Sequence, residues 1–328
     1  MSNWPNLPEN YLAYNFLITG GAGFIGSNLA EFLVNKGARH VRVLDNLSTG
    51  SKKNITSLLE KNNFEFIEGD ITSYECCEQA CDGVDFVFHQ AALGSVQRSI
   101  EAPINTNNAN VVGFLNMLEA SRNKRVKRFV YASSSSVYGD NMDLPKKEER
   151  IGNPISPYAV TKRVNELYAK VFYETYGMET IGLRYFNVFG PKQSPSGAYA
   201  AVIPLFIDAV LSGKSVKING DGTQMRDFTY IENVVLANIC AAFANKEGAT
   251  GKVYNVAFGE STSLNELLRL INEIAGANTS PIYGPPRIGD IKDSLADISM
   301  AKDFLGYMPL VNIKQGLQHT FNWFKQNY

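Results

Sequence analysis

A glycine-rich turn near the start of the chain constrains the fold more than any other feature. The segment TGGAGFIG, residues 19–26, lies between a short apolar run, NFLITG, and a run with helical spacing, GFIGSNLAEFLVNKG. Gly20, Gly23 and Gly26 carry no side chains, so backbone amides and the start of the helix can come close to a pyrophosphate. The segment therefore predicts a strand–turn–helix unit that binds a dinucleotide.

Asp45 adds a second signal to the glycine turn, because it ends the next apolar run, HVRVLD. Its carboxylate is placed to accept hydrogen bonds from the ribose hydroxyls of an adenosine, and its charge would repel a 2′-phosphate. The two signals together predict NAD rather than NADP as the cofactor. A tight turn followed by an exposed aspartate is the alternative that needs no ligand.

Short apolar runs and helical segments continue to alternate through FEFIEGD, DFVFHQAA, PINTNNANVVGFLNMLEASRN and RFVYASS. This alternation predicts an α/β fold with a doubly wound parallel sheet of the Rossmann kind. From about residue 190 the pattern loosens, and the helices AAVIPLFIDAVLSG and LNELLRLINEIAG are expected among the short strands VKING and KVYNVA. We expect an NAD-binding domain over residues 1–190 and a smaller C-terminal α/β substrate lobe over 191–328, with some exchange of chain between them.

Composition argues against several classes of partner. A net charge of -1 over 328 residues predicts no nucleic acid and no anionic membrane as partner. The basic run RNKRVKR, residues 122–128, follows a predicted helix and is expected to be a solvated helix end. No apolar run is long enough to span a bilayer and the start does not read as a signal peptide, so we expect a cytoplasmic protein. Four cysteines and three histidines at these spacings predict reduced, structural thiols and no metal site.

The segment SPYAVTKRVNE supplies a candidate general base. Tyr158 and Lys162 are four residues apart on a strongly helical run, so their side chains share one face. An ammonium ~5 Å from a tyrosine hydroxyl contributes about 3 kcal/mol, roughly two pKa units, toward the phenolate. Tyr-x-x-x-Lys alone is a common chance pairing on a solvated helix, but here it follows a dinucleotide turn and a serine-ended strand.

Four serines follow the apolar run that precedes this helix, in the segment YASSSS. The carboxyl ends of strands in a doubly wound sheet face the ligand crevice. Ser134 is therefore expected to hydrogen-bond the substrate oxygen whose proton Tyr158 removes. A merely polar strand exit describes Ser136 better than Ser134.

A series of motifs, taken in order along the chain, resembles those of the extended short-chain dehydrogenase/reductases that act on nucleotide sugars. The matching motifs are GGAGFIG, DNLSTG, GDI, HQAA, SSSSVYG, SPYAVTK, LRYFNVFGP, DGTQMRDFTYIENV and RIGDIKDSLAD. Within that family the chain is most similar to the UDP-hexose 4-epimerases. The segments ALGSVQRS and NVFGPKQSPSGAYAAVIP resemble the branch acting on UDP-N-acetylglucosamine and UDP-N-acetylgalactosamine.

The resemblance implies roles for particular residues. The catalytic residues it implies are Ser134, Tyr158 and Lys162. The cofactor contacts it implies are Gly20, Gly23, Phe24, Ile25, Gly26, Asp45, Asn46, Thr49, Gly50, Asp70, Ile71, Gln90, Ala91, Ala92, Asn110, Tyr158, Lys162, Tyr185 and Val188. The substrate contacts it implies are Gly94, Ser95, Ser134, Ser135, Asn187, Ala201, Val202, Lys217, Asn219, Arg226, Arg287, Asp290 and Ser294. Lys217 departs from the family, which often has an aromatic or apolar side chain there.

The implied activity is NAD-dependent epimerisation at C4 of a UDP-sugar, with no net redox change. Tyr158 removes the proton of the 4-hydroxyl while C4 passes a hydride to NAD, and the 4-keto sugar turns over before the hydride returns. In this family a bulky tyrosine near the C2 substituent confines the enzyme to glucose and galactose, whereas a small residue admits an acetamido group. The alignment puts Ser294 at that position, with Gly94 and Ser95 as further small lining.

Three other activities are compatible with a dinucleotide-binding fold of this kind. A 4,6-dehydratase of this family has an acidic pair after the catalytic hydroxyl, where this chain has Ser135 and Ser136. A 4-epimerase of UDP-glucuronate or of an N-acetylhexosaminuronate, or a UDP-uronate decarboxylase, remains open. A dinucleotide-sensing regulator would usually lack the Tyr158–Lys162 pair.

The family commonly forms homodimers through a four-helix bundle, and we expect the same here. The helices would be those at 103–122 and 157–176. The first carries apolar residues beyond one inward face, of which we expect Val111, Phe114, Leu115 and Leu118 to contribute.

Overall fold

A parallel sheet of seven strands forms the centre of the computed structural model, which describes residues 11–195, 200–285 and 293–327. In chain order the strands are β1 (Asn15–Thr19), β2 (His40–Asp45), β3 (Phe64–Glu68), β4 (Phe86–His89), β5 (Arg128–Ser134), β6 (Thr180–Tyr185) and β11 (Lys252–Val256). They lie in the order β3-β2-β1-β4-β5-β6-β11, and every neighbouring pair is parallel. The strand order reverses between β1 and β4, which confirms the predicted doubly wound sheet.

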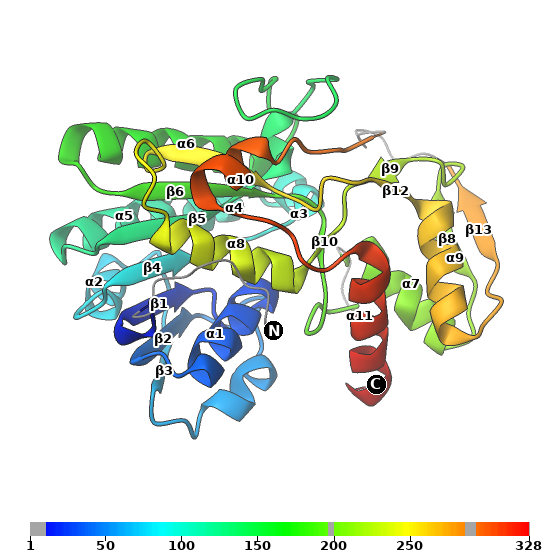
Figure 1. Ribbon diagram of the computed structural model, residues 1–328, viewed down its shortest axis with the longest axis horizontal. Helices are drawn as coiled ribbons and strands as arrows, with labels where there is room; N and C mark the ends of the chain where they lie inside the picture. The colour runs from blue at the N-terminus through cyan, green and yellow to red at the C-terminus, as the bar shows by residue number, and fades with distance from the viewer. Residues whose placement is uncertain (1–10, 196–199, 286–292, 328) are drawn as a thin grey trace.

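Helices cover both faces of this sheet (Figure 1). The helices of this body are α1 (Phe24–Lys36), α2 (Tyr74–Ala80), α3 (Val96–Glu101), α4 (Pro103–Asn107), α5 (Gly113–Asn123), α6 (Pro157–Tyr176) and α8 (Ile231–Phe243). Alternate side chains of β1 show the two layers, since Phe16 and Ile18 pack with α1 and α8 whereas Leu17 packs with α2, α5 and α6. Burial on both faces explains why these strands are short continuous apolar runs.

The helix predicted at 157–176 has clear start and stop residues. Ser156 caps it, with Oγ accepting a hydrogen bond from Ala159 N at 3.2 Å, and Pro157 occupies the first turn. Gly177 ends it in the left-handed conformation, with φ of 66°. These signals fix α6 over the predicted residues.

The helix predicted from residue 103 to 122 is not regular. A π-helical turn over Asn108–Val112 separates α4 from α5. Within that turn Asn110 is buried, and its side chain accepts from Leu93 N at 2.8 Å and donates to Thr161 Oγ1 at 3.1 Å. The wider turn thus carries a buried amide that connects the end of β4 to α6, as such turns often do near functional sites.

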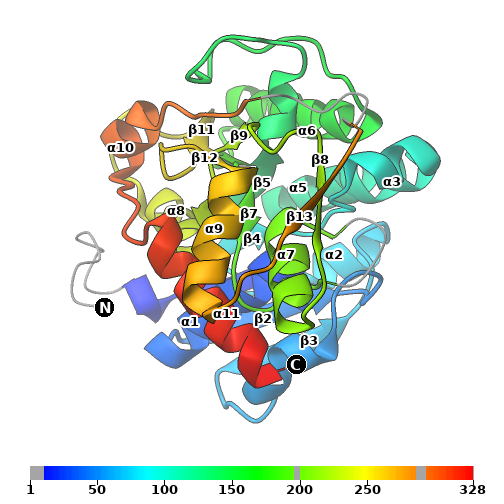
Figure 2. The ribbon, with the colours of Figure 1, turned by 90° about the vertical axis from the view of Figure 1, so that its right-hand side faces the viewer.

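Short strands and several helices form a smaller lobe, which Figure 2 views from its own side. The elements of the chain not yet named, in both parts of the molecule, are α7 (Val202–Leu211), α9 (Leu264–Ala275), α10 (Ser299–Leu305), α11 (Ile313–Asn327), β7 (Val188–Phe189), β8 (Val216–Asn219), β9 (Met225–Arg226), β10 (Thr229–Tyr230), β12 (Thr262–Ser263), β13 (Pro281–Gly284), and the short 3₁₀ helices η1 (Tyr11–Ala13), η2 (Lys52–Leu58) and η4 (Ser135–Tyr138). Of these, α10 packs on α8 and β11, η2 on α1 and η4 on α6, all in the large body. In the lobe α7, α9 and α11 pack together, and β8 pairs with β13.

The strand KVYNVA does not lie in the smaller lobe, where its place in the sequence suggested it would be. It forms β11 and pairs with β6 at the edge of the large sheet. The helix before it, α8, also packs on that sheet. The chain beyond residue 190 therefore contributes to both parts, and the boundary at that residue stays a prediction.

The basic run at 122–128 is only partly a solvated helix end. Arg122, Lys124 and Lys127 form ion pairs at the surface. For Arg128 the prediction is wrong, because its side chain is only 11% exposed and its Nη1 donates to carbonyl oxygens at the end of α8, those of Ala241, Ala242 and Ala244. A guanidinium is placed there because the last carbonyls of a helix lack partners within it.

The outer face of α4, α5 and α6 differs from the prediction in its residues. Phe114 and Leu118 are fully buried in the core beneath the sheet and cannot contribute to an interface. The fully exposed apolar side chains are those of Ile104, Val112, Val160, Leu167 and Val171, whereas the predicted Val111 and Leu115 are half-buried. Periodicity could not separate the two sets, because both faces of the helix carry apolar residues.

Three further findings bear on the class of protein. Across residues 11–195, 200–285 and 293–327, every helix is too short or too polar to cross a membrane. In the same part of the chain no three His, Cys, Asp or Glu side chains gather as a metal-binding group. All four cysteines are free thiols, and burial raises the pKa of Cys240 to about 12.

Candidate active site

A cavity of about 1430 Å³ opens at the carboxyl ends of β1, β2 and β4, where the strand order reverses. Ligands of doubly wound proteins bind at this position. The predicted cofactor residues that line it are Gly20, Gly23, Phe24, Ile25, Gly26, Asp45, Asn46, Thr49, Asp70, Ile71, Gln90, Ala91 and Ala92.

The glycine turn has the geometry that its sequence predicts. Gly20 has φ of +66°, and a Cβ there would lie 2.7 Å from the backbone of Ala91. A Cβ on Gly26 would collide with the carbonyl oxygen of Gly20, so this glycine lets α1 start close against the turn. The first free amides of α1 follow Gly23 and border the cavity, where they suit a pyrophosphate.

Asp45 is held by the same turn that it helps to shape. Its Oδ2 accepts from Ala22 N at 2.9 Å, and its Oδ1 accepts from Leu47 N at 2.8 Å. A carboxylate has about four acceptor positions, so two remain for ribose hydroxyls. A helix start at one point of the cavity and this carboxylate at another fit an NAD molecule.

Six predicted cofactor residues lie outside the cavity lining that the described residues define, namely Gly50, Asn110, Tyr158, Lys162, Tyr185 and Val188. Gly50 packs against Asp45, where a Cβ would be 3.0 Å from the carboxylate oxygens. Asn110 lies in the π turn, and Val188 begins β7. The hydroxyl of Tyr185 lies 3.2 Å from Gln90 Oε1, so this side chain supports a residue of the cavity wall.

The opposite wall of the cavity was not predicted. It is formed by Lys192, Gln193, Ser194 and Pro195, and by Trp323, Phe324 and Asn327 of α11. Lys192 is fixed by an ion pair of 2.7 Å with Glu31. Only the amphipathic spacing of the last helix points to these residues, and that spacing does not say what the helix faces.

Lys162 is buried one helical turn after Tyr158. Its side chain is 2% exposed, its Nζ donates to Ala132 O at 2.7 Å, and the same atom lies 5.9 Å from the centroid of the Tyr158 ring. Burial lowers the pKa of Lys162 to about 8, against the opposing effect of the Glu166 charge. Burial raises the pKa of Tyr158, and a hydrogen bond with Ser134 lowers it. The structure thus brings together the three side chains that were predicted to act together.

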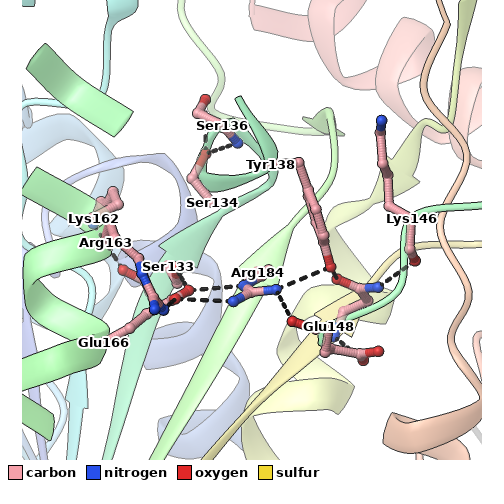
Figure 3. Close-up of polar contacts among 12 residues, drawn as sticks. Ser133, Ser134, Ser136, Tyr138, Lys146, Glu148, Lys162, Arg163, Glu166 and Arg184 are labelled. Atoms are coloured by element: carbon pink, nitrogen blue, oxygen red, sulfur yellow. Dashed lines mark hydrogen bonds and ion pairs between the residues drawn. The ribbon is translucent and has the colours of Figure 1, made fainter. Parts of the chain in front are cut away.

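Ser134 ends β5 and caps the 3₁₀ helix η4 (Figure 3). Its Oγ accepts from Ser136 N and donates to Ser136 Oγ, both at 3.1 Å. Ser136 is therefore more than a polar strand exit, since it orients the hydroxyl beside Tyr158. Ser135 begins η4 and is partly exposed.

The predicted substrate residues form separate groups. Asn187 Nδ2 donates to Ser294 Oγ at 3.2 Å, and Ser294 N donates to the carbonyl of Met225, next to Arg226, at 3.1 Å. Lys217 and Asn219 lie on β8, and Ala201 and Val202 lie at the start of α7. Gly94 borders the cavity, and Ser95 caps α3 by accepting from Arg98 N at 3.1 Å. The last two, Arg287 and Asp290, lie outside the described residues.

A doubly wound sheet with a dinucleotide cleft at its switch point, and a Tyr–Lys pair whose lysine is buried, define a Rossmann-type, dinucleotide-dependent enzyme. Residues 16–257 match the model of the NAD dependent epimerase/dehydratase family, and the chain belongs to that family. NAD is accordingly its cofactor.

Similar proteins extend over nearly the whole chain. A putative UDP-glucose 4-epimerase of Methanocaldococcus jannaschii is 39% identical, covering 95% of this chain and 98% of its own. A solved UDP-N-acetylglucosamine 4-epimerase from Methanobrevibacter ruminantium, in complex with UDP-N-acetylmuramic acid, is 39% identical with a TM-score of 0.91, covering 96% and 99%. A UDP-glucuronic acid 4-epimerase from Bacillus cereus, solved with UDP-glucuronic acid and NAD, is 32% identical with a TM-score of 0.88, covering 96% and 100%. The predicted resemblance to extended short-chain dehydrogenase/reductases is confirmed.

Proposed function

We propose that this protein is a UDP-sugar 4-epimerase that prefers UDP-N-acetylglucosamine and UDP-N-acetylgalactosamine. The observation that carries the epimerase proposal is the group of half-buried Ser134, half-buried Tyr158 and buried Lys162 at the end of β5, together with a cleft that fits NAD. The similar proteins support it, since the three described above are 4-epimerases by name and differ in the sugar they are named for.

Each catalytic side chain has a distinct task. Tyr158 takes the proton of the 4-hydroxyl, and the Ser134 hydroxyl turns away from Ser136 Oγ when substrate binds, so that its single proton is donated to the same sugar oxygen. Lys162 stabilises the phenolate by its charge, and its hydrogen bond to Ala132 O fixes the ammonium in place. When bound, NAD supplies the acceptor and donor for the hydrogen at C4. Arg226 and the residues on β8 and α7 hold the nucleotide while the sugar turns over.

The preference for acetylated sugars rests on Ser294. Its hydroxyl is fixed by the amide of Asn187, at 3.2 Å, so a short polar side chain occupies the place assigned to the C2 substituent. Gly94 has no neighbouring atom within 4 Å of the position of a Cβ, which leaves further space. A structure solved with a UDP-N-acetylated sugar is among the similar proteins.

A UDP-uronate is the second candidate substrate, because a UDP-glucuronic acid 4-epimerase is also among the similar structures. A 4,6-dehydratase is disfavoured by Ser135 and Ser136, which provide hydroxyls where an acidic pair is needed.

The test is incubation of the purified protein with UDP-N-acetylglucosamine, UDP-glucose or UDP-glucuronate, without added NAD, with products identified by NMR. We expect the C4 epimer of the acetylated sugar to form fastest. Faster conversion of UDP-glucuronate would refute the sugar preference but not the reaction. A dehydrated product, formed by loss of water from the sugar, or no product from any of the three substrates, would refute the epimerase proposal.

A further inference from the structure

A buried ion pair joins α6 to β6, the strand next to the one that carries Ser134 (Figure 3). Glu166 of α6 and Arg184 of β6 are 4% and 1% exposed. The guanidinium grips both carboxylate oxygens, with Nε 2.8 Å from Oε1 and Nη2 2.9 Å from Oε2. None of the roles assigned above uses this pair.

Glu166 ties the catalytic helix to the catalytic strand. It lies one helical turn after Lys162, and its Oε1 accepts a hydrogen bond from Ser133 Oγ at 2.6 Å. Lys162 itself binds the carbonyl of Ala132 at 2.7 Å. Helix α6 is thus hydrogen-bonded to Ala132 and Ser133, the two residues that immediately precede Ser134.

Arg184 contacts the segment that follows Ser134 in the chain. It pairs with Ser133 in the register of β5 and β6. Its Nη1 donates to Tyr138 Oη at 3.1 Å and to the carbonyl of Glu148 at 2.9 Å. Tyr138 ends η4, the turn that Ser134 caps. One guanidinium therefore contacts the helix of Lys162 and the turn of Ser134.

We propose that Glu166 and Arg184 are positioning residues for the epimerase reaction, which hold Lys162 and Ser134 against Tyr158 and set the electrostatic field at the Lys162 ammonium. The inference rests on the proposed function, because it needs these three side chains to be catalytic.

Four elements carry the titratable and charged groups around Lys162 and its partner Glu166. On α6 they are Tyr158, Arg163 and Glu166, on β6 Arg184, which binds Glu166, and on β5 Tyr131, whose pKa is raised by burial and by the Glu166 charge. His89 on β4 is neutral, because burial and the Lys162 charge lower its pKa to about 3. Glu166 is the anion of this group, and it opposes the burial that lowers the pKa of Lys162. Arg184 and Arg163 both bind that anion, at 2.8 Å and 3.0 Å.

A structural role alone predicts something different. Breaking a buried ion pair destabilises a protein whatever its other role, so lost stability or lower turnover would not distinguish the two explanations. The charges do distinguish them, because the two partners act on Lys162 with opposite signs. Removing the anion favours the neutral amine, whereas removing the cation favours the ammonium.

The experiment compares kcat against pH for the parent, Glu166→Gln and Arg184→Gln. Activity needs the ammonium, so kcat of the parent falls as pH rises through the pKa of Lys162. We expect Glu166→Gln to move this alkaline limb to lower pH, and Arg184→Gln to move it to higher pH, each by on the order of one unit. KM for the UDP-sugar should change less than about twofold in both, because neither residue contacts substrate. Glu174→Gln is the matched control on the same helix, since that carboxylate is exposed and its ion pair is 3.6 Å long.

A third variant keeps the proposal testable if the two core variants do not fold. Arg163 is 34% exposed and binds the same carboxylate at 3.0 Å, so Arg163→Gln should fold and move the limb upward by a smaller amount. If the variants fold and are active, but their kcat falls at the same alkaline pH as that of the parent, the positioning role is refuted. An inactive parent would refute the proposed function and with it this role.

Discussion

Replacing Lys162 by methionine tests how the tyrosine is activated. Methionine keeps the length and apolar contacts of the lysine stem and removes only the charge. The ammonium lies 5.9 Å from the centroid of the Tyr158 ring. At an effective dielectric near 20, an ammonium ~5 Å from the phenol oxygen contributes about 3 kcal/mol, or about two pKa units of the phenol. The phenolate fraction at neutral pH, and kcat with it, should therefore fall about 100-fold.

The assay follows epimerisation by NMR at a series of pH values and determines kcat and KM at each. We expect the deficit of Lys162→Met to shrink as pH rises, because the variant regains phenolate while the parent loses its ammonium above about pH 8. Lys170→Met is the control, since Lys170 is 62% exposed on the same helix. A deficit that is equal at every pH, or a normal rate at neutral pH, would refute this reasoning. The NAD content of the purified variant shows whether cofactor binding has changed instead.

Three other predictions follow from the same site and surface. Tyr158→Phe should lower kcat by roughly 10²- to 10⁴-fold with little change in KM, because only the base is lost; steady-state kinetics that show near-normal turnover would mean that another group is the base. Ser294→Tyr should abolish turnover of UDP-N-acetylglucosamine by steric exclusion and spare UDP-glucose, and an unchanged rate on the acetylated sugar would disprove the assignment of Ser294. Light scattering should give a dimer mass at micromolar concentration, and Leu167→Asp should give a monomer; a parent monomer would contradict an interface over α4, α5 and α6.

Local patterns predicted most of the sheet. Each strand of the first half is a short apolar run between turn residues, so its existence can be read without tertiary information. Helix α8 was missed for a physical reason: it is buried on nearly every side, and its sequence, IENVVLANICAAF, therefore has no polar face to mark the helical period. The place of β11 was missed because a strand of five residues does not indicate which sheet it will join.

The candidate site likewise has features that local sequence predicts and features that depend on tertiary packing. The glycine turn, Asp45 and the Tyr158–Lys162 pair have fixed spacings within one unit of structure, so sequence alone predicts them. The contact between Glu166 and Arg184 depends on how α6 lies across β6, and no local pattern encodes that packing. The far wall of the cavity comes from α11, at the opposite end of the chain from the turn that it faces.

The most direct test of the central claim follows the hydrogen at C4. The purified protein, given no NAD, is incubated with UDP-N-acetylglucosamine deuterated at C4, and with UDP-glucose deuterated in the same way. The account predicts epimers that keep their deuterium at C4, with no accumulation of NADH, because the hydrogen leaves and returns within one active site. Loss of deuterium to solvent, or a requirement for stoichiometric NAD with NADH accumulating, would contradict it.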